Sequence, residues 1–140
     1  MCANYSNLTK MGLQLNVLDK IPPIILVGLG GVIGSITRYG IGQMINSAKF
    51  PLATLVVNLC GSILLGIIVT LYQSNQLSHD WMAFLGIGLM GSLTTMSSFA
   101  VDTINTGDTT ISILNIVITL VGVLVGAIAG KTLALKYLIV

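Results

Sequence analysis

Charged side chains are scarce in this sequence, and glutamate is missing altogether. Only 7% of the 140 residues are Asp, Glu, Lys or Arg, whereas 54% are hydrophobic. A soluble domain carries roughly a quarter charged residues, so this chain has too few to cover a surface that faces water. Its net charge of +2 is too small to favour nucleic-acid binding. The composition therefore excludes an ordinary soluble domain and indicates a protein surrounded by lipid.

Residues that usually build catalytic or metal sites are equally rare. Cys2 lies in the polar start of the chain and Cys60 in a hydrophobic run, so we expect two free thiols rather than a disulfide. The single histidine, His79, lies in a polar segment with no cysteine or glutamate near it. The order of Ser, His and Asp suggests no catalytic triad, and no phosphate-binding loop occurs. We therefore predict that the protein is not an enzyme.

Long uncharged runs dominate the rest of the chain. A helix crosses the hydrocarbon layer with about 20 apolar residues, and the runs between charges predict four such crossings at roughly 22–46, 51–73, 81–105 and 110–137. The sequence thus predicts an all-α, multi-pass protein of the cell membrane, with a polar N-terminal tail (1–20) and one transmembrane domain (21–140). Pro22, Pro23 and Pro51 suit helix starts, and Ser78 or Asp80 could cap the third helix. Because four helices cannot easily enclose a pore alone, we expect an oligomer.

Small residues recur at intervals of four along three of the spans. Such spacing lets two helix backbones approach closely inside a membrane. We interpret it as plain helix packing, which says nothing about a substrate. The sets are Gly30 and Gly34; Asn58, Ser62 and Gly66; and Gly122, Gly126 and Gly130.

The middle of the third span differs from an ordinary membrane helix. It reads Gly91-Ser92-Leu93-Thr94-Thr95-Met96-Ser97-Ser98-Phe99, mostly Gly, Ser and Thr where a lipid-facing helix would carry Leu and Ile. One interpretation is a broken helix, which is tolerated at that depth only when protein or a watery cavity surrounds it, and whose carbonyl oxygens could hold a cation. The other is an intact helix whose hydroxyls bond back to their own carbonyls. Composition alone does not decide between them.

Isolated polar residues inside the spans are the candidate functional groups, because polar groups in lipid usually face a bundle interior or a pathway. Asn58 offers amide donors to an anion or to a neighbouring helix. Asn115 and Thr119 are four residues apart and share one helix face, again as ion donors or as interhelical hydrogen-bonding groups. For Arg38 and Asp102, near helix ends, we expect snorkelling toward the headgroups, although their opposite charges permit a structural pair.

Together these pieces resemble the Fluc (CrcB) fluoride-channel family. The resemblance is carried by three segments that occur in family order and at family-like spacing. They are Gly30 to Tyr39; Thr54 to Asn58 with Gly61, Ser62 and Gly66; and Gly91 to Phe99 with Asp102.

The resemblance implies a dual-topology dimer, in which two oppositely inserted subunits form two antiparallel fluoride pathways and the third helix is broken. It places a structural sodium ion on the backbone carbonyls of Gly91 and Thr94. It assigns Asn58, Phe99 and, by a weaker alignment, Asn115 and Thr119 to the ion pathway, to which we add Ser98. One departure is Met96, where the family has a phenylalanine whose electropositive ring edge faces fluoride.

The function expected from this resemblance is passive export of fluoride, which lowers its concentration in the cytoplasm. Met96 and a mild excess of lysines on the side of the chain termini leave two partners open: a second copy of the chain, or a similar four-helix subunit. An alternative is a small proton-coupled transporter, for which Asp102 would be the only membrane carboxylate. Another is a subunit that does not conduct by itself.

Overall fold

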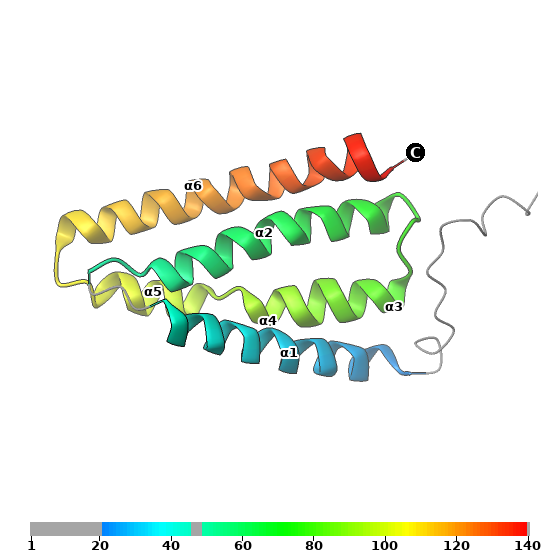
Figure 1. Ribbon diagram of the computed structural model, residues 1–140, viewed down its shortest axis with the longest axis horizontal. Coiled ribbons are helices and arrows are strands. Elements are labelled where there is room, and N and C mark those ends of the chain that lie inside the picture. Colours follow the sequence, from blue (N-terminus) through cyan, green and yellow to red (C-terminus); the bar gives the residue numbers. More distant parts are fainter. Residues whose placement is uncertain (1–20, 46–48, 140) are drawn as a thin grey trace, which may run out of the picture.

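The computed structural model describes residues 21–45 and 49–139, and all regular elements in these residues are helices (Figure 1). The predicted tail at 1–20, with Cys2, lies outside them. The elements are α1 (Pro23–Met44), α2 (Leu52–Gln73), α3 (His79–Trp81), η3 (Met82–Met90), α4 (Gly91–Leu93), α5 (Met96–Ile104), α6 (Thr109–Leu133) and η4 (Ala134–Leu138).

Four membrane-length helical segments confirm the predicted spans. Each is long and apolar enough to cross a bilayer, and they run over Pro23–Met44, Leu52–Gln73, His79–Ile104 and Thr109–Leu138. The start of α1 and the end of η4 lie at the same end of the bundle (Figure 1), as an even number of crossings requires. The protein is a multi-pass membrane protein.

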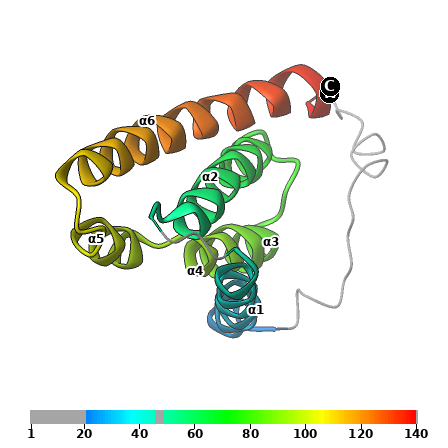
Figure 2. The same ribbon diagram turned by 60° about the vertical axis from the view of Figure 1, so that its left-hand side comes forward.

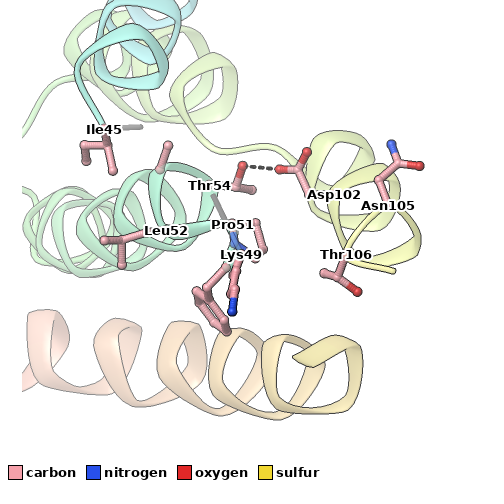
Figure 3. Close-up of a pocket in the computed structure, with 10 residues that line it drawn as sticks. Ile45, Lys49, Pro51, Leu52, Thr54, Asp102, Asn105 and Thr106 are labelled. Carbon is pink, nitrogen blue, oxygen red and sulfur yellow. Dashed lines mark hydrogen bonds between the residues drawn. The ribbon is translucent and has the colours of Figure 1, made fainter. Parts of the chain in front are cut away.

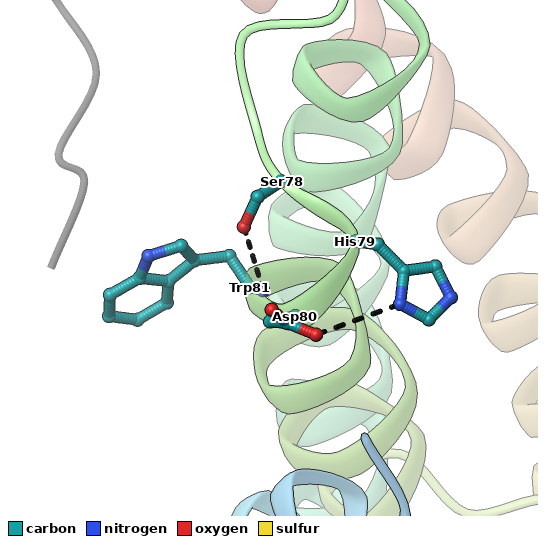
Figure 4. A network of polar contacts seen from close by, with 4 residues as sticks. All are labelled: Ser78, His79, Asp80 and Trp81. Atoms are coloured by element: carbon teal, nitrogen blue, oxygen red, sulfur yellow. Dashed lines mark hydrogen bonds and ion pairs between the residues drawn. The ribbon is translucent and has the colours of Figure 1, made fainter. Parts of the chain in front are cut away.

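The start of the third span shows how local chemistry sets a helix boundary. Ser78 is the N-cap, and its hydroxyl accepts a hydrogen bond from the Trp81 backbone N–H at 3.4 Å (Figure 4). Such a cap satisfies one of the N–H groups that have no partner within the helix. Asp80, the other predicted cap, instead lies 3.8 Å from the ring of His79. Trp81 packs edge-on against Phe84.

Glycine lets two pairs of elements approach at backbone distance. In α1, a Cβ at Gly30 or Gly34 would collide with a backbone carbonyl of η3. In α6, a Cβ at Gly130 would collide with the Ile63 carbonyl of α2. Figure 1 and Figure 2 both show α2 between α6 and the part of the third span that runs from α3 to α4. The small-residue spacing therefore marks helix packing, as predicted.

The third span is interrupted at Thr94 and Thr95. Thr94 has φ −76° and ψ 152°, and Thr95 has φ −151° and ψ 119°, both extended conformations. Helical geometry resumes at Met96 in α5. Of the two interpretations of this segment, the broken helix is right and the intact helix is wrong.

The N-terminal half of the third span is a second departure from regular α-helix. Met82–Met90 forms nine residues of π-helix, in which the backbone bonds to the fifth residue along rather than the fourth. The apolar run carries no pattern that separates π-helix from α-helix, and the sequence did not predict it.

We expect Gly130→Ala to destabilise the fold by about 1–3 kcal/mol, because α2 and α6 would have to move apart. Thermal unfolding in detergent would measure the loss. Gly122→Ala is the matched control, since a Cβ there would meet Leu59 at an ordinary 3.6 Å. Equal melting temperatures for the two variants would contradict the close approach.

Candidate functional site

Asn58 holds the break in the third span. Its Nδ2 donates to the Thr95 carbonyl at 3.1 Å, and its Oδ1 accepts from the Thr95 N–H at 2.8 Å. The interruption removes both Thr95 backbone groups from helical bonding, and one amide side chain replaces both partners. Asn58 is only 7% exposed, so water does not compete for these bonds. Of its two predicted roles, bonding to a neighbouring helix is therefore present, and it leaves one Nδ2 hydrogen for a further acceptor.

Arg38 also lies at the break rather than at the membrane surface. Its Nε donates to the Ser92 carbonyl at 3.1 Å, near the C-terminal end of α4. A cation is favourable there because the last carbonyls of a helix carry partial negative charge. Snorkelling was the wrong expectation for this half-buried side chain, because the freed carbonyl offers it a partner inside the bundle.

Two other carbonyls at the break have no such partner. Among the residues that the structure describes, neither the Gly91 oxygen nor the Thr94 oxygen accepts a hydrogen bond. Gly91 is exposed and Thr94 half-buried. Unpaired carbonyls at membrane depth are costly unless protein, water or an ion satisfies them.

A buried chain of hydrogen bonds joins α5 to α6. The Thr119 hydroxyl donates to Asn115 Oδ1 at 3.2 Å, and Asn115 Nδ2 donates to Thr103 Oγ1 at 2.7 Å. Thr103 in turn donates to the Phe99 carbonyl at 2.6 Å. Asn115 is 1% exposed and Thr119 3%. The shared face predicted for Asn115 and Thr119 is present, and it points into the protein.

Thr103 is the one residue of this hydrogen-bonded series that the sequence did not predict. It lies eight residues after Thr95 in the same span, on a short helix that exists only because of the break. A threonine near the end of an apolar span looks like an ordinary surface residue. Only the tertiary structure brings it close to Asn115. A threonine one helical turn after Phe99 nevertheless indicates that α5 has a polar side.

Asp102 separates two cavities. Its Oδ2 accepts a hydrogen bond from the Thr54 hydroxyl (Figure 3). The residues that line an inner cavity of about 470 Å³ include Arg38, Thr95 and Ser98. An outer cavity of about 280 Å³ is lined in part by Lys49. Thr54 and Asp102 line both cavities. Arg38 and Asp102 thus share a cavity, but within the described part of the chain they form no direct ion pair. The carboxylate is held by Thr54, which lies near the start of α2.

The residues after the break face different surroundings. Phe99 is 5% exposed, whereas Met96 is 67% exposed. Ser98 is half-buried, and its backbone N–H donates to the Thr95 hydroxyl at 3.1 Å, which caps α5. Phe99 therefore belongs to the interior of this subunit, while Met96 projects from its surface.

The arrangement suits a small anion better than a reaction. Amide and hydroxyl groups are buried between the helices, and Arg38 places a fixed cation at the break. Among the described residues, no group of three or more His, Cys, Asp or Glu could bind a metal ion. Protein donors that replace water one after another are what an ion-selective path requires.

Comparison with known proteins agrees with this description. The family model described as "CrcB-like protein, Camphor Resistance (CrcB)" matches residues 25–131. A protein of Ruminiclostridium cellulolyticum named fluoride-specific ion channel FluC is 35% identical, over 79% of this chain and 91% of that protein. Proteins with the same name in Shewanella pealeana and Shewanella halifaxensis are 43% and 39% identical. The first alignment covers 58% of this chain and 68% of the relative, and the second 68% and 82%.

Asn58→Ala should loosen the break, because it leaves the half-buried N–H and carbonyl of Thr95 without partners. We expect a stability loss of about 1–3 kcal/mol and faster hydrogen exchange at Thr95. Hydrogen-exchange mass spectrometry of the purified protein would measure where exchange becomes faster and by how much. Asn105→Ala, at the exposed end of α5, is the control. Unchanged exchange at Thr95 would show that Asn58 does not hold the break.

Proposed function

The chain belongs to the CrcB-like family, and from this premise we propose that it is a subunit of a fluoride-specific channel. Fluoride would pass down its gradient and leave the cytoplasm without coupling to another solute. The observation that carries the proposal is the buried series of donors on α2, α5 and α6. Fluoride binds water tightly, so it crosses a membrane only where protein donors replace that water without trapping the ion.

The pathway we propose follows the residues already named. Asn58 and Ser98 lie at the break, and Phe99, Asn115 and Thr119 lie deeper between α5 and α6. Asn58 keeps one amide hydrogen free after binding Thr95. The Phe99 side chain is apolar, but the edge of its ring is electropositive and can face the anion. Arg38 adds positive potential beside the break, which favours an anion.

We further propose that a second four-helix subunit, inserted in the opposite orientation, covers the exposed side of the break. Gly91 lies on the surface with an unpaired carbonyl, and lipid cannot satisfy it. Met96 is exposed as well, and it would then contact the partner's pathway rather than its own. The simplest partner is a second copy of this chain.

The Gly91 and Thr94 carbonyls fit a structural sodium ion, because hard cations prefer oxygen ligands and neither oxygen has a partner among the described residues. Bound there, sodium would supply positive potential near both pathways. Fluoride flux that is unchanged when potassium replaces sodium in every buffer would contradict this assignment.

Liposomes that contain the purified chain should release fluoride and retain chloride. A fluoride electrode and a chloride electrode measure the two fluxes, and protein-free liposomes give the background. Release by this chain alone supports a dimer of identical subunits. If flux appears only with a similar second chain, the partner is a different subunit, and equal release of both halides would contradict fluoride specificity.

Met96→Phe should maintain or raise the fluoride flux, because it places a ring edge where the thioether offers no electropositive group. Ile104→Phe is the control, since Ile104 is also exposed on α5 but lies two turns from the break. The same liposome assay compares the variants. Complete loss of flux in Met96→Phe alone would show that position 96 does not face the pathway as proposed.

A further inference from the structure

We propose that Thr103 is a positioning residue that orients the Asn115 amide, so that the Asn115 N–H, and not the Thr119 hydroxyl, is the donor presented to the ion. The proposal rests on the fluoride-channel function proposed above. It concerns the direction of each hydrogen bond in the α5–α6 chain, which follows from which atoms are able to donate.

The direction of these hydrogen bonds is fixed where the series ends, at the Phe99 carbonyl. A backbone carbonyl oxygen only accepts, so the Thr103 hydroxyl hydrogen must point to the Phe99 oxygen, 2.6 Å away. The Thr103 oxygen is then left as an acceptor. The Asn115 atom that lies 2.7 Å from it must therefore be the donor, Nδ2. A backbone group thus selects between the two orientations of the amide.

The remaining atoms follow from this choice. With Nδ2 toward Thr103, Asn115 Oδ1 faces Thr119 and accepts its hydroxyl hydrogen at 3.2 Å. A threonine hydroxyl has one hydrogen, so Thr119 has none left for an anion. Asn115 Nδ2 has two hydrogens and uses one. No other described residue accepts from it, so among Thr103, Asn115 and Thr119 this second N–H is the only spare donor.

Burial makes the orientation consequential. Asn115 is 1% exposed, so an ion that reaches this depth has little water to replace a donor that is turned away. If the amide rotated by half a turn, it would present a carbonyl oxygen, which repels an anion. Thr103 would then control conduction without touching the ion, by keeping the amide the right way round.

Thr103→Val removes the hydroxyl at nearly constant volume and should lower the fluoride flux about tenfold, the effect expected for one lost hydrogen bond at the barrier. Thr103→Ser keeps the hydroxyl and should restore most of the flux. Thr70→Val is the matched control, because Thr70 is equally buried and donates to the Gly66 carbonyl at 2.6 Å, but lies outside the α5–α6 chain. It should leave the flux unchanged.

A double-variant test separates positioning from a general loss of structure. In Asn115→Leu, which has no amide, adding Thr103→Val should cause no further loss of flux. Additive losses would overturn the proposal, as would equal losses in Thr103→Val and Thr70→Val. Full retention of flux in Thr103→Val would do the same.

A spectroscopic readout does not depend on conduction. In protein labelled with ¹⁵N-asparagine, the Asn115 side-chain signal should shift in Thr103→Val and stay in place in Thr103→Ser and Thr70→Val. An unshifted signal in Thr103→Val would overturn the orienting role even in a conducting protein. A wild-type protein that passes no fluoride would overturn the proposed function, while the shift would still decide whether Thr103 orients the amide.

Discussion

The paired hydrogen bonds between Asn58 and Thr95 are the interaction on which the rest of the site depends. A membrane helix keeps its backbone polar groups paired because lipid offers no alternative. The third span gives up that pairing at one point, and a single amide on another helix, 37 residues earlier in the sequence, restores it. Arg38 satisfies a further carbonyl at the same place. With these two residues, the third span leaves and resumes helical geometry while the Thr95 backbone groups stay paired.

The break is what brings the polar residues together. After the break, α5 lies beside the start of α6 (Figure 2), and this places Thr103 within hydrogen-bond distance of Asn115. A continuous third helix would have carried Thr103 along a different line. The break therefore has two effects: it frees carbonyl oxygens near Gly91 and Thr94, and it assembles a buried series of donors next to them. Both effects favour ions, the first a cation and the second an anion.

The close helix contacts supply the rigidity that this arrangement needs. Glycine at positions 30 and 130 lets backbones touch, so α1 is fixed to η3 and α6 to α2. Gly61 has a related role, since a Cβ there would collide with the Thr94 side chain. The break thus rests directly on α2, the helix that also carries Asn58. Small residues that are uninformative about a substrate still determine where the functional groups lie.

The sequence by itself determined that lipid surrounds the protein, how many times it crosses the membrane, and which segment of the third span is unusual. Charge scarcity and uncharged runs reflect the lipid directly, and a glycine- and hydroxyl-rich segment cannot be an ordinary lipid-facing helix. It also named Asn58 and Asn115, because a polar residue in such a run is always costly. Only the tertiary structure decided what these residues bind. It moved Arg38 from the headgroups to the break and found Thr103, because hydrogen-bond partners 54 and 12 residues apart are set by how helices pack, which no local pattern encodes.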